Sequence, residues 1–239
     1  MRTLPAVVVL LALAAAGCSD HPAPAPSLVG HHAVVAGANG TVVSANRGSL
    51  RTADFEMASG VTTLVVHSGD LGGGLYRIST PAGAGQVPTA VVDDGQVVAQ
   101  LNSSGTNGPS IVDVELSDAV AWTIHLDGGA TVARVDMHEG GLATLDFGAG
   151  VTRIDATVPR GAVTVRMSGG ASEFDVHAPD GVPARVTMGG GGSSATIDGT
   201  QHTGIAGGTV FAPSTWPSSG PRVDVDNTAG VSTFTLDRY

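Results

Sequence analysis

The side chains best suited to chemistry are carboxylates in the middle of the chain. Asp136, Asp155 and Asp175 each occupy a comparable place in a repeated pattern, so we expect them to stack on one face. Carboxylate oxygens are ligands that Ca²⁺ prefers, but Ca²⁺ usually takes six or more oxygens from a flexible loop. A flat ladder presents its oxygens in a line. We therefore keep the three aspartates as metal candidates, but favour a solvated polar face without metal or other cofactor.

Other catalytic patterns are missing from the sequence. It contains no G-x-S-x-G motif, and the glycine runs at 69–74 and 188–194 are not followed by Gly-Lys-Ser or Gly-Lys-Thr. His138 and His177 fall outside the register of the repeat. The sequence therefore predicts no catalytic residues.

One aromatic residue occupies a position suited to contact with another molecule. Trp216 lies in the loop sequence A-P-S-T-W-P-S-S-G, between prolines. It could contact a partner, or it could cover the open end of a stacked fold, because such ends need protection. We favour the covering role and keep partner contact as the alternative.

The first eighteen residues have the parts of a secretion signal. Arg2 supplies the positive end, an apolar run follows, and small residues lead to Cys18, the single cysteine of the chain. The segment L-A-A-A-G-C resembles the lipobox of bacterial lipoproteins, although that family prefers Leu where this chain has Ala15. The resemblance implies cleavage before Cys18 and attachment of fatty acyl chains such as palmitate to it. The expected location is the extracytoplasmic face of the cell membrane, with an ordinary signal peptide as the alternative.

The segments beyond Cys18 divide into a tether and one domain. Residues 18–40 begin with alternating Pro and Ala, a composition typical of an extended spacer. With residues 1–17 as the signal peptide, residues 41–239 remain for a single domain. The formal net charge of the full chain is −10, which argues against nucleic acid as a partner.

The domain is expected to be all-β. Short segments alternate apolar and polar residues, and 35 Gly and 13 Pro supply turns between them. Residues 121–200 read as four repeats of about 20 residues, each a strand, a Gly-rich turn and a second strand. The repeats predict a single β-solenoid, similar to a parallel β-helix, with an antiparallel meander as the alternative.

Equivalent residues of the repeats should stack in columns, because coils of a solenoid lie about 4.8 Å apart. In the first strands we expect one inward column of Ile124, Leu145, Val165 and Val186. In the second strands we expect Val135, Ile154, Phe174 and Ala195 to line up. The same alignment places Arg134 level with Arg153 and produces the aspartate column described above.

Several glycine-punctuated units carry a resemblance to a known family. They include F-E-M-A-S-G-V-T-T-L-V-V-H-S-G, D-F-G-A-G-V-T-R-I-D and V-D-V-D-N-T-A-G-V-S-T-F-T-L. Over residues 50–239 the chain resembles the bacterial "putative adhesin" or toast-rack β-solenoid family. The resemblance implies a solenoid-like domain on the cell envelope, sometimes linked to adhesion, and carries no catalytic residues.

These observations favour one function class over another. We expect a membrane-anchored lipoprotein that acts as a non-enzymatic binding, adhesin-like or scaffold module. Its partners would be the membrane, through Cys18, and an unknown envelope protein or polysaccharide. The alternative is a β-helix enzyme acting on cell-wall polysaccharide, which would need a cleft with converging carboxylates.

Overall fold

Every regular element in the described residues is a β-strand, which confirms the expected all-β class. The computed structural model describes residues 33–37 and 40–239. The strands are β1 (Ala33–Gly37), β2 (Gly40–Asn46), β3 (Thr52–Met57), β4 (Val61–Gly69), β5 (Gly74–Thr80), β6 (Gln86–Asp93), β7 (Gln96–Ser103), β8 (Ile111–Ser117), β9 (Ala121–Leu126), β10 (Ala130–Asp136), β11 (Gly141–Phe147), β12 (Val151–Thr157), β13 (Ala162–Met167), β14 (Ala171–Ala178), β15 (Ala184–Met188), β16 (Gly192–Ile197), β17 (Thr200–Ile205), β18 (Thr209–Phe211), β19 (Arg222–Asn227) and β20 (Val231–Arg238).

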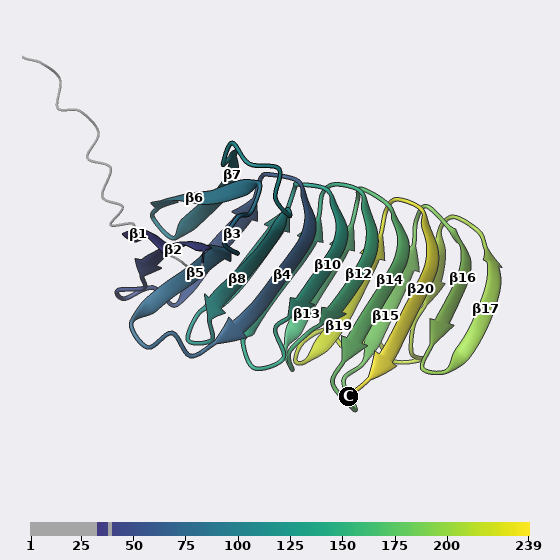
Figure 1. Cartoon of the computed structure of the whole chain (residues 1–239). Coiled ribbons are helices and arrows are strands. Elements are labelled where there is room, and N and C mark those ends of the chain that lie inside the picture. The colour runs from purple at the N-terminus through teal and green to yellow at the C-terminus, as the bar shows by residue number, and fades with distance from the viewer. Residues whose placement is uncertain (1–32, 38–39) are drawn as a thin grey trace, which may run out of the picture.

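The strands form two mixed sheets that enclose the core (Figure 1). The 11-stranded sheet has the order β1-β2-β5-β8-β4-β10-β12-β14-β20-β16-β17, and the 9-stranded sheet has the order β18-β15-β19-β13-β11-β9-β3-β7-β6. Pairing is parallel in the middle of both sheets and antiparallel at their ends, where β1, β17, β18 and β6 form the outer strands. The two ends of the larger sheet, β1 and β17, lie at opposite ends of the molecule.

The central part of the chain winds from one sheet to the other. Strands β9, β11 and β13 pair in parallel in one sheet, while β10, β12 and β14 pair in parallel in the other. Their inward side chains meet between the sheets, where Phe147, Phe174 and Phe234 are fully buried. Phe174 contacts the other two rings edge-on at centroid distances of 5.6 and 5.5 Å. Each such buried side chain contributes about 1.5–3 kcal/mol, and neighbouring windings share one core.

Glycine allows the corners of neighbouring windings to lie almost in contact. A Cβ at Gly128 would be 2.0 Å from the carbonyl oxygen of Ser59. At Gly169 it would be 2.0 Å from the backbone of Ala149. No side chain fits at these distances, which explains the glycines that punctuate the repeat.

The expected stacking order is wrong at the C-terminal end. Val165 is paired with Val225 of β19, and Val225 is paired in turn with Val186. Strands β19 and β20 therefore lie between the third and fourth repeats, although they follow both in sequence. A similar exchange places β7 and β8 outside β3 and β4. The strands share one alternating pattern, so their sequences do not encode which neighbour each one takes.

The expected register of the first repeat is also wrong in its second strand. Ala133, and not Val135, is level with Ile154, and Arg134 is level with Asp155. A shift of two residues keeps the same side chains inward, because side chains alternate with a period of two. The hydrophobic pattern therefore allows either register. The structure separates Asp136 from the column of Asp155 and Asp175, so the three-aspartate column does not form.

Some expectations concern residues outside the described part of the chain. Cys18, the expected signal peptide at 1–17 and most of the expected tether at 18–40 lie outside the described residues. Strand β1, within that last range, is paired with β2. In the described residues no helix has the length and apolar character needed to cross a membrane.

Candidate functional site

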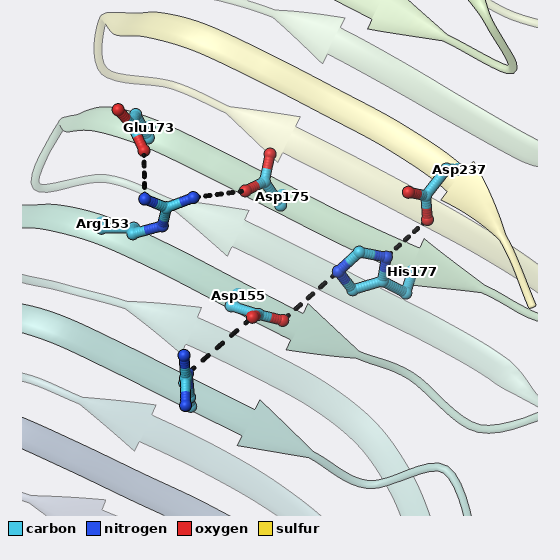
Figure 2. A network of polar contacts seen from close by, with 7 residues as sticks. Arg153, Asp155, Glu173, Asp175, His177 and Asp237 are labelled. Atoms are coloured by element: carbon cyan, nitrogen blue, oxygen red, sulfur yellow. Dashed lines mark hydrogen bonds and ion pairs between the residues drawn. The ribbon is translucent and has the colours of Figure 1, made fainter.

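Two regions gather polar side chains, and the first is the outer face of the 11-stranded sheet. Figure 2 shows Arg153 of β12 between two carboxylates of β14: its Nη1 lies 3.0 Å from Glu173 Oε2, and its Nη2 lies 4.0 Å from Asp175 Oδ2. Arg134 of β10 lies 3.9 Å from Asp155. Each of the aspartates Asp155 and Asp175 thus has a cation beside it from a preceding strand.

His177 continues this network toward the last strand (Figure 2). Its Nε2 lies 3.3 Å from Asp155 Oδ1, and its Nδ1 lies 2.5 Å from Asp237 Oδ1. The imidazole can donate to both carboxylates only when both ring nitrogens carry protons. The network joins β10, β12, β14 and β20, and its side chains are partly exposed. Each exposed ion pair contributes about 0–1 kcal/mol, so the network adds little to the free energy of unfolding.

The predicted metal candidates therefore do not converge. Asp136 is bonded to His138, one winding away from Asp155, and Asp155 and Asp175 face arginines or histidine. Among the residues that the structure describes, no group of three or more His, Cys, Asp or Glu side chains is placed to hold a metal ion. On this face, cationic and anionic side chains pair between neighbouring strands.

His138 lies in the turn that follows β10. Its Nδ1 is 2.7 Å from Asp136 Oδ1, and its Nε2 is 3.4 Å from Glu139 Oε1. The hydrogen bond to Asp136 is the main cause that raises the pKa of His138 above its ordinary value of 6.5. The sequence placed both His138 and His177 out of register, yet each finds a carboxylate.

The second polar region is a hollow at the end of the molecule opposite β1. We call it the end hollow, and its volume is about 500 Å³. Residues of the β16–β17 hairpin and of β18 line it, and β20 contributes Arg238. Its lining includes Ile197, Asp198, Thr200, His202, Phe211 and Arg238.

A fixed ion pair lies on one side of the end hollow. Arg238 Nε donates to Asp198 Oδ1 at 2.7 Å and Nη2 donates to Asp198 Oδ2 at 2.9 Å. Arg238 Nη1 also donates to the carbonyl oxygen of Val182 at 2.7 Å. Three hydrogen bonds therefore hold the planar guanidinium in one orientation. The charges of the pair compensate each other within the hollow.

Two rings form another part of the lining. The imidazole of His202 and the phenyl ring of Phe211 lie 4.6 Å apart at 41°. They come from β17 and β18, the outermost strands of the two sheets at this end. The pair spans the gap between the sheets.

Trp216 lies outside the end hollow. Its ring is 4.6 Å below the guanidinium carbon of Arg185, a residue of β15 that is bonded to Asp224 of β19. Arg185 precedes the inward-facing Val186, so its side chain is on the outer face of the 9-stranded sheet. The end of the molecule is covered by β17 and β18, so the expected covering role of Trp216 is not seen. Partner contact by Trp216 stays a prediction.

The sequence did not identify the residues of the end hollow. Asp198 and Gly199 form a D-G pair between two strands, a signal for a tight hairpin that could have placed β16 beside β17. Arg238 comes from a strand forty residues further on, and it reaches Asp198 only because β20 is paired with β16. No local signal encodes that contact.

Comparison with known proteins adds a fold neighbour. No protein-family model matches the sequence, and the search of curated proteins gave no match. The crystal structure of a "putative cell adhesion protein" from Clostridium sporogenes superposes with a TM-score of 0.61 at 16% identity, covering 83% of this chain and 98% of that one. At this identity the likeness concerns the fold alone. A "putative adhesin" from Bacteroides fragilis is aligned over 82% of this chain and 96% of its own at 10% identity, but its TM-score of 0.25 is too low to show a shared fold.

Proposed function

We propose that this chain is a non-enzymatic, adhesin-like binding module of the bacterial envelope, built as a short β-solenoid and anchored through Cys18. The observation that carries the proposal is the composition of the end hollow. Of the lining residues, Asp198 alone is a carboxylate, and both its oxygens accept hydrogen bonds from Arg238. Hydrolysis of a glycosidic bond normally requires two carboxyl groups across the bond, one of them free to donate a proton. The site is therefore suited to binding and unsuited to the alternative of polysaccharide cleavage.

The position of the hollow supports the same function. Strand β1 lies at one end of the stack, and β17, whose residues Thr200 and His202 line the end hollow, lies at the other (Figure 1). An anchor at Cys18 would hold the β1 end toward the membrane and present the hollow away from it. The fold neighbour from Clostridium sporogenes, described as a "putative cell adhesion protein", supports this role.

The binding function can be tested on envelope fragments. Beads that carry the full chain are mixed with envelope fragments of the source cells, and co-sedimentation and new reducing sugar ends are measured together. We expect co-sedimentation without release of reducing ends. Release of reducing ends would support the enzyme, and absence of co-sedimentation would overturn the binding function.

The anchor is tested by Cys18→Ser. We expect this variant to leave the membrane fraction or to accumulate unprocessed, because it lacks the sulfur that carries the acyl chains. Two acyl chains hold a protein on a bilayer far more firmly than one, so the change should be nearly complete. Fractionation followed by immunoblotting measures it, with Ser19→Ala as the control. Retention of a processed Cys18→Ser chain in membranes would contradict the anchor.

A further inference from the structure

We infer that the end hollow binds a neutral sugar ring, and this inference rests on the binding function proposed above. The volume of about 500 Å³ falls within the range of about 300–1,000 Å³ that is usual for small-molecule sites. Such sites combine apolar walls with a few polar groups that orient the ligand. The end hollow has both parts.

The charges in the hollow select for a neutral ligand. Arg238 is the one arginine or lysine in the lining, and Asp198 already compensates its charge through two hydrogen bonds. An anionic ligand would compete with Asp198 for the guanidinium, and it would approach a chain of net charge −10. A neutral ligand neither competes with Asp198 for the guanidinium nor is repelled by the net negative charge.

The polar groups of the hollow suit hydroxyls. Arg238 uses three of its five N–H groups on Asp198 and Val182, which leaves two for a ligand oxygen. The oxygens of Asp198 keep further lone pairs, and the Thr200 hydroxyl can both donate and accept. A hydroxyl also both donates and accepts, so a ligand rich in hydroxyls can satisfy all three groups.

The apolar part of the hollow suits the C–H face of a sugar ring. Ile197 and Phe211 lie in the same lining as Thr200 and Arg238, and Phe211 is only partly buried. A pyranose has an apolar face of C–H groups and a rim of hydroxyls, which matches a site with aromatic and polar walls. Strands from both sheets surround the hollow, so it is suited to a compact ring rather than to an extended peptide, which would pair along an open strand edge.

Saturation-transfer NMR on the full chain in detergent tests the inference. The probes are the methyl glycosides of glucose, galactose, mannose and N-acetylglucosamine, with N-acetylneuraminic acid as an anionic sugar and an uncharged hexapeptide as the other ligand class. We expect binding of at least one neutral glycoside and neither comparison ligand. Phe211→Ala should weaken the binding about tenfold, which corresponds to about 1.4 kcal/mol, because it removes the aromatic wall of the hollow.

Two further variants keep the test decisive. Thr200→Val removes the hydroxyl at nearly constant shape, and it should weaken binding several-fold even if Phe211→Ala fails to fold. Val91→Ala is the control, because Val91 is an exposed apolar residue of β6, at the end of the 9-stranded sheet opposite β18, and this variant should bind as the unaltered chain does. Binding of no neutral glycoside, preference for the peptide or anionic sugar, or equal binding by Thr200→Val would overturn the inference. If envelope fragments still co-sediment in that case, the sugar assignment fails while the binding function stands.

Discussion

Four of the five histidines in the described residues lie within 4.0 Å of a carboxylate. The pairs are His67 with Asp113, His125 with Asp146, His138 with Asp136, and His177 with Asp155 and Asp237. All except the pair of His138 join different strands. The fifth, His202, contacts Phe211 in the end hollow. The polar faces are therefore built from contacts between strands, and a residue's partner depends on which strand lies beside its own.

The pKa of His138 depends on the two carboxylates beside it. Asp136 raises its pKa chiefly by a hydrogen bond, and Glu139 contributes less. A folded pKa above the unfolded value means that the contribution to stability is present below about pH 6.5 and disappears as the pH rises through the folded pKa. NMR titration of the imidazole should show a larger fall in pKa for Asp136→Asn than for the control Glu139→Gln. Equal falls would contradict the role of the hydrogen bond.

At the scale of elements, tight hairpins end the parallel stack. Asp94 and Gly95 connect β6 to β7 with φ of 43° and 85°, and Asp198 and Gly199 connect β16 to β17 with φ of 47° and 80°. Two consecutive residues with positive φ are typical of the two-residue type I′ turn, which returns the chain antiparallel to the strand before it. These hairpins add strands β6 and β17 outside the wound part of each sheet and so cover its ends.

The hairpin at the end hollow should depend on Gly199. Gly199→Ala places a Cβ at φ of 80°, which costs about 1–2 kcal/mol for a residue other than glycine. For a domain of this size, each 1 kcal/mol lowers the melting temperature by about 2–4 °C. The control is Gly73→Ala, where φ lies outside the left-handed region and no atom lies within 4 Å of the added Cβ. Thermal denaturation that shows the same fall for both variants would rule out the turn assignment.

At the scale of the whole molecule, the last strands of the chain are internal strands of the stack. β19 lies between β13 and β15, and β20 lies between β14 and β16. Their inward residues Val223, Val225, Phe234 and Leu236 are fully buried. At this end of the stack, two internal strands thus come later in the sequence than the outer strands β17 and β18.

Truncation distinguishes this arrangement from a stack in sequence order. A chain ending at residue 220 loses these four side chains and the buried Val231, five apolar side chains worth about 7.5–15 kcal/mol together, which is comparable to the whole stability of a typical domain. We expect it to lose cooperative unfolding, as measured by circular dichroism during heating. The control chain ends at residue 238 and lacks only Tyr239, so it should melt cooperatively. A cooperative melt of the shorter chain near the original temperature would show that β19 and β20 are dispensable end strands.

The local features of the fold follow from the sequence. The alternation around Ile124 and Leu126 predicts a strand with these residues inward, and the structure confirms both as buried. The match of Ile124 with Leu145, and of Leu145 with Val165, is also confirmed. Period-two alternation determines the inward face, and glycine determines where the chain can turn closely. Both effects act within a few residues, so they can be predicted from sequence.

Which strands are neighbours, and in which register, depends on contacts across the whole domain. The alternating pattern is nearly the same in β15 and β19. Whether Val186 or Val225 is the partner of Val165 therefore depends on how all the strands are ordered in the two sheets. A two-residue shift leaves the same face inward, so the pattern could not place Arg134 beside Asp155. The end hollow depends on both choices, because Arg238 reaches Asp198 only when β20 lies next to β16. Local sequence thus specifies the strands, their inward faces and their turns, whereas competition among similar strands for neighbours specifies the polar faces and the end hollow.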